Sequence, residues 1–297
     1  MPDEPSIYRS AEAEAEVSSI YDGLLADWPV PFDLLSVPTR YGEVAVVASG
    51  PGAGAPVLAL HASSMAATSW RPNIRALVDA GFRVLAPDYI GEAGRSRLGD
   101  LSVFPKTGRQ IGELQTEIAD GLGVGPVPVI AASAGGHAAL RFALAAPERV
   151  ERLALLGPMG IVPLGLRAAL RMTAVNMFPK EARVARTTRW AIGSAAEVVD
   201  QYGPWFSAVL RSIATPPRVG RPVALKPDEM RRLAMPVLLV LGNRDNLVGD
   251  PLKAARRAAS FPDVDVRILE SGHLIGVERA AEVDRLLVRF LRGEALP

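Results

Sequence analysis

The stretch "PVPVIAASAGGHAAL", residues 126–140, places the hydroxyl group of Ser133 between a strand-like run and a helix-like run. Val127 and Ile130 favour a strand, because β-branched side chains suit a pleated sheet. The alanine- and leucine-rich residues 134–144 favour a helix. Ser133 is therefore predicted at a turn that leads directly from a strand into a helix.

Largely apolar runs recur on both sides of this turn. They are "VLALH" from Val57, "RVLAPD" from Arg83, "RLALLG" from Arg152 and "VLLVLG" from Val237, followed by the more alternating "VDVRIL" from Val264. Such runs are typical of strands buried on both faces, as in a parallel sheet covered by helices. Segments with helical spacing separate them. We expect an α/β fold with a mostly parallel, doubly wound sheet of about eight strands.

The chain divides into three predicted parts. Residues 1–34 form an N-terminal extension with a helix over residues 11–26, and residues 35–160 and 233–297 form the α/β core. Residues 161–232 contain no strand-like run and are too long for a plain loop, so they are predicted to insert a helical cap. Basic residues outnumber acidic ones there, which fits either a solvated surface or attraction of an anionic substrate or carrier.

Composition narrows the functional classes. The net charge of +1 gives no reason to expect a nucleic-acid partner, and the absence of cysteine excludes disulfide and thiolate chemistry. No apolar run reaches the length of a membrane span, and the acidic start of the chain does not resemble a signal peptide. We expect a soluble, cytoplasmic protein.

Three residues predict nucleophilic catalysis. A serine at a strand-to-helix turn has the geometry of a nucleophile elbow, which requires small residues two places before and after it; Ala131 and Gly135 stand there. A serine hydroxyl also needs a base and a carboxylate that orients the base. His273 follows the last predicted strand, and Asp245 follows the preceding one. The carboxyl ends of parallel strands meet at one edge, so we predict a Ser133–His273–Asp245 triad.

These features resemble the α/β-hydrolase superfamily, and within it bacterial carboxylesterases with a helical cap. The resemblance covers residues 37–291 and includes the chain order Ser, Asp, His. It also includes "DYIGEAGRS", residues 88–96, which is similar to the family's Asp-x-x-Gly-x-Gly-x-Ser turn. The fold implied is the α/β-hydrolase fold with an inserted cap.

The resemblance also implies an oxyanion loop. His61 and Ala62 stand where the family has a His-Gly pair. By this resemblance the backbone N–H groups of Ser63 and Ala134 would hold the oxyanion, and His61 would brace the loop. Ala62 in place of glycine predicts a different path for the loop. "GEAG", residues 91–94, is one residue longer than the usual Gly-x-Gly, which predicts a reshaped bend there.

Candidate substrate contacts come from residues near these motifs. Met65, Met159 and Leu274 lie in loops next to the predicted site, and Trp205 lies in the insertion. They are expected to line an apolar pocket. No metal is expected, because three scattered histidines and no cysteine make no ligand cluster. No cofactor is expected either, because no glycine-rich phosphate loop opens a helix.

We expect a serine hydrolase that cleaves a carboxylic ester, a lactone or a thioester with an apolar acyl or alcohol part through an acyl-enzyme. Relatives that cleave carbon–halogen bonds or epoxides use Asp at the elbow, which Ser133 disfavours. An acyltransferase or cyclase and a carbon–carbon bond hydrolase would use the same triad and stay open. A non-catalytic ligand-binding module is less expected, because all three triad residues are present. The oligomeric state is left open.

Overall fold

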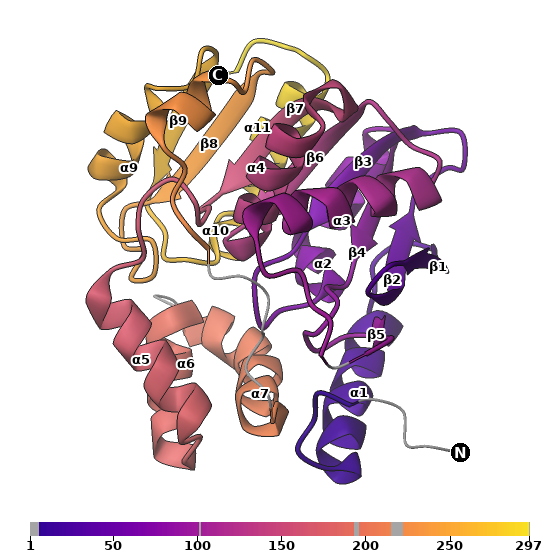
Figure 1. Ribbon diagram of the computed structural model, residues 1–297, viewed down its shortest axis with the longest axis vertical. Helices are drawn as coiled ribbons and strands as arrows, with labels where there is room; N and C mark the ends of the chain where they lie inside the picture. The colour runs from indigo at the N-terminus through magenta and orange to yellow at the C-terminus, as the bar shows by residue number, and fades with distance from the viewer. Residues whose placement is uncertain (1–5, 101, 193–195, 215–221, 297) are drawn as a thin grey trace.

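The computed structural model describes residues 6–100, 102–192, 196–214 and 222–296, and a sheet with helices on both faces forms its core (Figure 1). The nine strands follow the order β1-β2-β4-β3-β6-β7-β8-β9, and β5 pairs with β2 outside this path. Their bounds are β1 Phe32–Thr39, β2 Gly42–Ser49, β3 Ala55–Leu60, β4 Phe82–Pro87, β5 Arg97–Leu98, β6 Val127–Ala132, β7 Val150–Leu156, β8 Val237–Gly242 and β9 Val264–Leu269.

The sheet is mostly parallel, as predicted. Strands β4, β3, β6, β7, β8 and β9 run parallel to one another, and β1, β2 and β5 join in antiparallel pairs. The central strands are buried on both faces, which explains their continuous apolar runs. Strand β5, which lies outside the main strand order, has only two residues and no apolar pattern that could predict it. Strand β1 begins at Phe32, within the predicted extension, because its pairing with β2 continues to Ser49.

Two sets of helices cover the two faces of the sheet. One face packs against α2, α11 and α1, and the other against α3, α4 and α9. The α-helices are α1 Ala11–Ala26, α2 Arg71–Asp79, α3 Gly108–Gly121, α4 Ala134–Ala145, α5 Leu166–Met177, α6 Glu181–Ile192, α7 Ala196–Ser212, α8 Pro227–Arg231, α9 Pro251–Ala258, α10 Ile275–Glu278 and α11 Ala280–Leu291; the 3₁₀ turns are η1 Ala67–Trp70 and η2 Pro147–Arg149. None of the described helices is both long and apolar enough to cross a bilayer.

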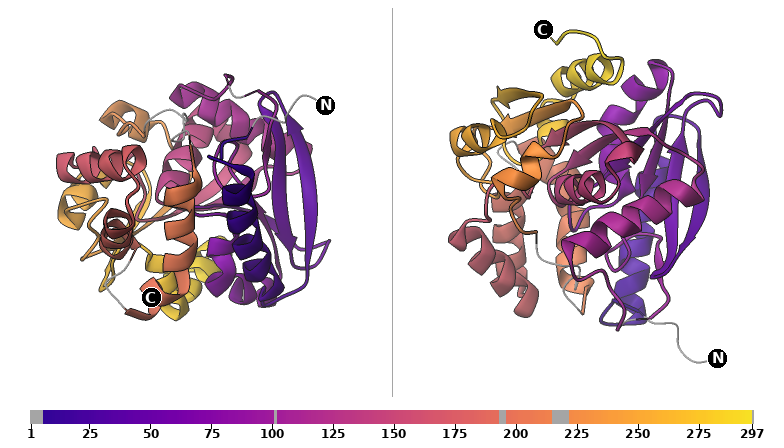
Figure 2. Two further views of the ribbon diagram at one scale, coloured as in Figure 1. Left: turned by 90° about the horizontal axis from the view of Figure 1, so that it is seen from below. Right: turned by 45° about the horizontal axis from the view of Figure 1, so that its top comes forward.

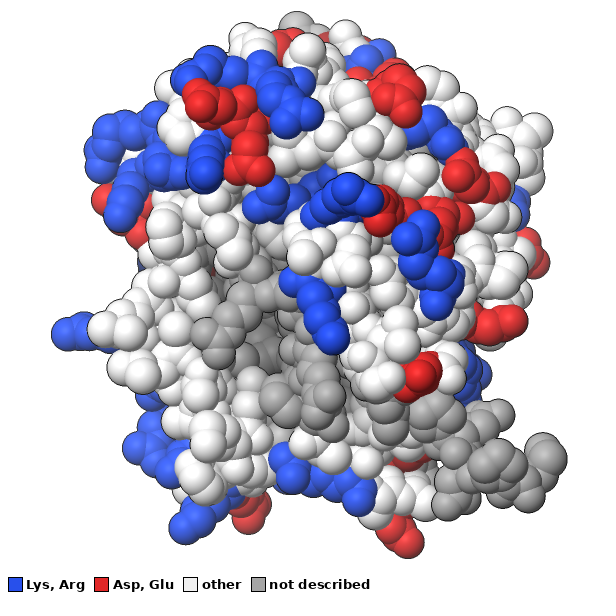
Figure 3. Space-filling view, viewed as in Figure 1, with Lys and Arg blue, Asp and Glu red and all other residues white. Residues whose placement is uncertain are grey.

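Helices α5, α6 and α7 lie together beyond one end of the sheet (Figure 1). They follow β7 in the chain and fall within the predicted cap, of which residues 193–195 and 215–221 lie outside the described residues. Helices α5 and α6 fall on the segments "GLRAALRM" and "EARVARTTRWAI", whose composition favours a helix. Blue basic side chains and white uncharged ones dominate this lower-left region of the surface, and red acidic ones are few (Figure 3).

Helix α1 occupies residues 11–26, as the sequence predicted, and lies beside α7 (Figures 1 and 2). Arg211 of α7 pairs with Glu16 of α1, and Arg9 donates to the carbonyl of Arg211. Tyr21 of α1 contacts the ring of Trp205 on α7 and donates its hydroxyl to Asp88 at 2.8 Å. The N-terminal helix is therefore packed against both α7 and the core.

Candidate active site

Ser133 lies at a sharp turn between β6 and α4. Its backbone has φ 50° and ψ −116°, a combination that is strained for a residue with a side chain. A Cβ atom on Gly135 would lie 2.3 Å from the carbonyl oxygen of Leu60, so only glycine fits there. The serine N–H donates to the carbonyl of Leu156 on β7, which ties the turn to the sheet. This is the geometry of a nucleophile elbow.

The structure brings Ser133, His273 and Asp245 together. The Oγ of Ser133 is 2.9 Å from Nε2 of His273, and Nδ1 of the same imidazole is 2.7 Å from Oδ2 of Asp245. All three side chains are buried. Because a carboxylate oxygen accepts, Nδ1 carries the proton and Nε2 faces the serine hydroxyl as an acceptor. The imidazole is thus oriented to remove the serine proton.

Asp245 is held as a carboxylate in the turn after β8. Its Oδ1 accepts the backbone N–H groups of Leu247 and Val248 at 2.8 and 2.9 Å. Burial alone would raise the pKa of Asp245, but the interaction with His273 and the two backbone N–H groups outweigh it and lower the pKa. The negative charge that would stabilise an imidazolium is therefore present at neutral pH.

Residues 61–65 form the loop predicted to hold the oxyanion. Fully buried His61 bonds backbone on both sides: Nδ1 lies 2.8 Å from the carbonyl of Ala62, and Nε2 accepts the N–H of Tyr89 at 3.1 Å. The N–H of Met65 donates back to Ala62, which closes a turn. Ala134 is the first residue of α4, so its N–H precedes any intrahelical acceptor. Ser63 follows the carboxyl end of β3 and Ala134 follows that of β6, and these two neighbouring parallel strands end at the same edge of the sheet.

A pocket lies beside Ser133 and His273. Its volume, including the part that is open to solvent, is about 440 Å³. Met65 and Leu274 are among the residues that line it. Most of the other contributors are apolar side chains or glycine: Ala62, Trp70, Ala132, Leu156, Ile275, Gly276 and Val277, with Ser69 and Asn73 as polar exceptions. The two predicted residues therefore face a mostly apolar space next to the serine.

The other two predicted substrate contacts lie elsewhere. Among the described residues that line the pocket, neither Met159 nor Trp205 appears. Met159 donates its backbone N–H to the carbonyl of Ser133 at 2.8 Å and so supports the elbow. Trp205 is buried, and its indole N–H donates to the carbonyl of Ser64 at 3.1 Å. Its size and apolar ring suggested a pocket wall, but its N–H group finds a backbone partner instead.

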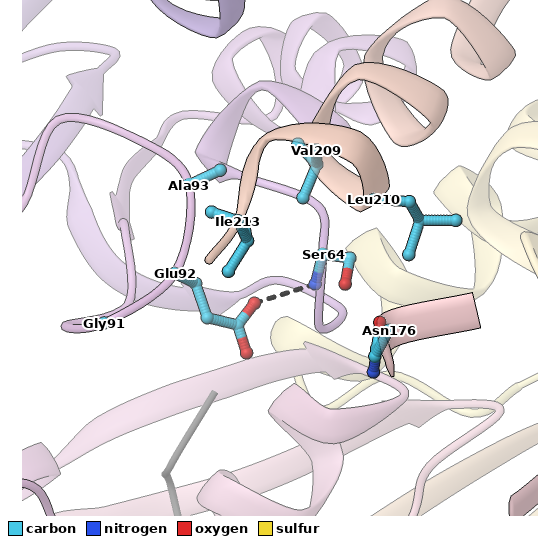
Figure 4. A pocket seen from close by; sticks show the side chains of 8 residues that line it. All are labelled: Ser64, Gly91, Glu92, Ala93, Asn176, Val209, Leu210 and Ile213. Carbon is cyan, nitrogen blue, oxygen red and sulfur yellow. Dashed lines mark hydrogen bonds between the residues drawn. The ribbon is translucent and has the colours of Figure 1, made fainter. Parts of the chain in front are cut away.

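Sequence reasoning did not identify Glu92 as part of this site. The Glu92 side chain is buried and accepts the hydroxyl of Ser63 at 2.9 Å and the N–H of Ser64 at 2.7 Å. Figure 4 shows its carboxyl group directed at the Ser64 backbone, on the wall of a second pocket of about 390 Å³. The only signal in the sequence was the lengthened "GEAG" turn that contains it.

His137, one turn after Ser133 on α4, has a structural environment. Its Nε2 accepts from Nε of Arg141 at 3.3 Å, and Arg141 also pairs with Glu229. Within the described part of the chain, no group of three or more His, Asp or Glu side chains is arranged to hold a metal ion.

Comparisons with known proteins agree with this geometry. The Alpha/beta hydrolase family matches residues 57–286. A protein from Bacillus subtilis named as the uncharacterized carboxylesterase nap is 29% identical over 92% of this chain and 91% of its own length. The crystal structure of carboxylesterase CesB (YbfK) from Bacillus subtilis superposes with a TM-score of 0.87 at 25% identity and covers 96% of this chain and all of that one.

A third relative catalyses a different reaction by name. The 2-hydroxy-6-oxononadienedioate/2-hydroxy-6-oxononatrienedioate hydrolase of Paraburkholderia xenovorans is 26% identical over 84% of this chain and 91% of its own length. The expected resemblance to hydrolases of the carboxylesterase type is confirmed by these matches. The family match spans most of the chain, and the chain therefore belongs to the alpha/beta hydrolase family.

Proposed function

We propose that this protein hydrolyses a carboxylic ester with an apolar acyl or alcohol part, with Ser133 as nucleophile, His273 as general base and acid, and Asp245 as the orienting carboxylate. The observation that carries the proposal is the line of two short contacts, 2.9 Å from Ser133 to His273 and 2.7 Å from His273 to Asp245, in a buried site. The carboxylesterase relatives support the ester class.

In this mechanism Nε2 of His273 takes the proton of the Ser133 hydroxyl while Oγ attacks the ester carbonyl carbon. The carbonyl oxygen becomes an oxyanion, which the N–H groups of Ser63 and Ala134 stabilise. The imidazolium, balanced by Asp245, then protonates the leaving alcohol, and an acyl-enzyme remains. Water enters, gives a proton to His273 and attacks the acyl carbon, which releases the acid and restores Ser133.

The pocket beside Ser133 supports an apolar substrate. Met65, Trp70 and Leu274 line it, and burial of apolar surface is the main favourable term for such a ligand. Helices α5 to α7 are proposed as the cap that completes the binding site, because they follow the carboxyl end of β7 and lie beyond that end of the sheet (Figure 1).

The proposal is tested with p-nitrophenyl acetate, butyrate and octanoate and with the Ser133→Ala variant. Wild type is expected to hydrolyse these esters, with kcat/KM higher for butyrate or octanoate than for acetate. Ser133→Ala is expected to lose about 10⁴-fold or more in kcat, because no other group supplies the nucleophile. Ser49→Ala, which alters a buried serine of β2, is the matched control and should retain activity. Equal rates for Ser133→Ala and wild type would contradict the proposal.

Hydrolysis of a carbon–carbon bond next to a carbonyl is the second candidate, favoured by the relative from Paraburkholderia xenovorans. The same three residues would serve it. Loss of the visible absorbance of a 2-hydroxy-6-oxo-dienoate substrate measures this reaction directly. A kcat/KM for the dienoate above that for every ester would make carbon–carbon hydrolysis the main activity. Product analysis with a competing alcohol detects acyl transfer in the same way.

A further inference from the structure

Ser64, next to the proposed oxyanion donor Ser63, has a strained backbone. Its φ of 59° lies in the left-handed region, which costs a residue with a side chain on the order of 1 kcal/mol. Such a conformation persists only where the surrounding structure holds it. The partners of this peptide therefore decide the shape of the oxyanion loop.

Both polar groups of Ser64 have side-chain partners from distant segments. Its N–H donates to Oε2 of Glu92 at 2.7 Å, and its carbonyl accepts the indole N–H of Trp205 at 3.1 Å. The second carboxyl oxygen of Glu92, Oε1, accepts the hydroxyl of Ser63 at 2.9 Å. One carboxyl group thus contacts two successive residues of the loop, one through its backbone and one through its side chain.

The peptide between Ala62 and Ser63 is held by contacts to its carbonyl group. The carbonyl of Ala62 accepts from Met65 N–H at 3.0 Å and lies 2.8 Å from Nδ1 of His61. Because a peptide is planar, fixing this carbonyl also fixes the direction of the Ser63 N–H on the opposite side. Among the described residues, that N–H has no hydrogen-bond partner of its own. It is left available for a ligand.

Glu92 is suited to this task by its burial and its position. It follows β4 in the lengthened turn, and Figure 4 shows its side chain extended toward the Ser64 backbone. Burial raises the pKa of Glu92, although His61 and the hydrogen bonds from Ser64 and Ser63 oppose the shift. Its carboxyl group links the turn after β4 to residues 63 and 64 through the two hydrogen bonds that it accepts.

We propose that Glu92 is a positioning residue for the reaction: its carboxyl group holds residues 63 and 64 in the conformation that aims the Ser63 N–H at the oxyanion. This inference rests on the proposed function, and it assigns Glu92 no direct contact with substrate. Its consequence is specific. Loss of the two hydrogen bonds should weaken stabilisation of the transition state and leave ground-state binding in the pocket nearly unchanged.

The test compares Glu92→Ala and Glu92→Gln with wild type, with kcat expressed per active site titrated by a fluorophosphonate. Glu92→Ala is expected to lower kcat at least tenfold and to change KM less than threefold. Glu92→Gln is expected to stay within threefold of wild-type kcat, because its amide oxygen accepts the Ser64 N–H and its NH₂ donates to Ser63. A trifluoromethyl ketone, which forms an oxyanion on Ser133, should lose affinity for Glu92→Ala in proportion to kcat/KM.

Glu117→Ala is the matched control. The Glu117 carboxylate also accepts one backbone N–H and one side-chain donor, both from Arg40, but far from the site. Its kcat per titrated site should match that of wild type.

Where Glu92→Ala gives no folded protein, Ser63→Ala removes one of the two contacts and should lower kcat two- to fivefold. A wild-type kcat for Glu92→Ala or for Ser63→Ala, or a Glu92→Gln as impaired as Glu92→Ala, would overturn the inference. The Ser133→Ala result stands apart from these outcomes and tests the proposed function alone.

Discussion

The elbow at Ser133 and the proposed oxyanion loop at Ser64 both contain a residue with a strained backbone, but the strain is held in different ways. Among the described residues other than glycine, these two serines alone have a positive φ. The elbow is imposed by its immediate neighbours, a buried strand, a helix and Gly135. The loop is held by Glu92 and Trp205, which lie 28 and 141 residues away in the chain. Strain built from local sequence can be read in a motif, whereas strain held by distant partners cannot.

The largest effect is expected from breaking the elbow with Gly135→Ala. The added Cβ would meet the carbonyl oxygens of Leu60 and His61 at 2.3 and 2.6 Å, and these backbone atoms cannot move without shifting β3. We expect a loss of about 4 kcal/mol or more in the free energy of unfolding and no measurable esterase activity. Chemical denaturation followed by circular dichroism measures the first, and the ester assay measures the second.

Gly23→Ala is the control for that substitution. Gly23 also lies in a helix, but a Cβ there would meet no atom within 4 Å. The free energy of unfolding of the Gly23→Ala variant should be unchanged or higher by up to about 1 kcal/mol, because alanine favours the helix. An equally stable Gly135→Ala would mean that the elbow is not sterically constrained as described.

A smaller effect on folding stability is expected when the pH is lowered, because His137 lies buried in α4, the helix that follows the elbow. Burial first, and Arg141 second, lower the pKa of His137 to about 4, against a smaller opposing effect of Glu229. The unfolded chain, with an ordinary histidine pKa of about 6.5, binds this proton first. Folding stability from this group is therefore present above about pH 6.5 and is lost as the pH falls toward 4, by about 3 kcal/mol in all.

His137→Gln removes that titration and keeps an acceptor for Arg141. The unfolding free energy of wild type should therefore fall more steeply between pH 7 and 4.5 than that of the variant, as measured by urea denaturation at each pH. Parallel curves for the two proteins would show that His137 protonates equally well in the folded state.

The smallest effect is expected at the loop, from Trp205→Phe. The phenyl ring keeps the contact with Tyr21 but removes the hydrogen bond to Ser64, which is worth about 1 kcal/mol. We expect kcat to fall about fivefold with little change in KM. Trp28→Phe is the matched control, because Trp28 donates its indole N–H to the buried Ser49, away from the loop. Both variants should lose similar stability, and only Trp205→Phe should lose kcat. Equal kcat values for the two variants would show that the hydrogen bond from Trp205 to Ser64 does not affect catalysis.

Much of the fold could be predicted from the sequence because the central strands of its sheet are buried on both faces. The apolar runs located the parallel strands, and the helix over residues 11–26 followed from its composition. The start of β1 at Phe32 was missed, because an exposed edge strand has no continuous apolar run. Helix α7 was not singled out, since Gly203 and Pro204 interrupt its pattern.

The site divides in the same way. The proposed triad of Ser133, Asp245 and His273 could be predicted because each residue follows a strand of the parallel part of the sheet, which brings the carboxyl ends of its strands together. The position of Trp205 could not be predicted, because the sequence gives no indication of which backbone carbonyl a tryptophan in an insertion contacts. Glu92 carried a weak signal in its lengthened turn, but its contact with Ser64 depends on two loops that meet only in the folded chain.

The residue to which a fluorophosphonate attaches tests most directly whether Ser133 is the nucleophile. The probe reacts with a serine that is activated by a base, so peptide mapping by mass spectrometry should find one adduct, on Ser133. The rate of labelling should fall at least a hundredfold in His273→Gln, because the imidazole no longer accepts the serine proton. Labelling of another residue in an enzyme that hydrolyses esters, or an unchanged rate in His273→Gln, would contradict the claim that this elbow serine and its histidine are the reactive pair.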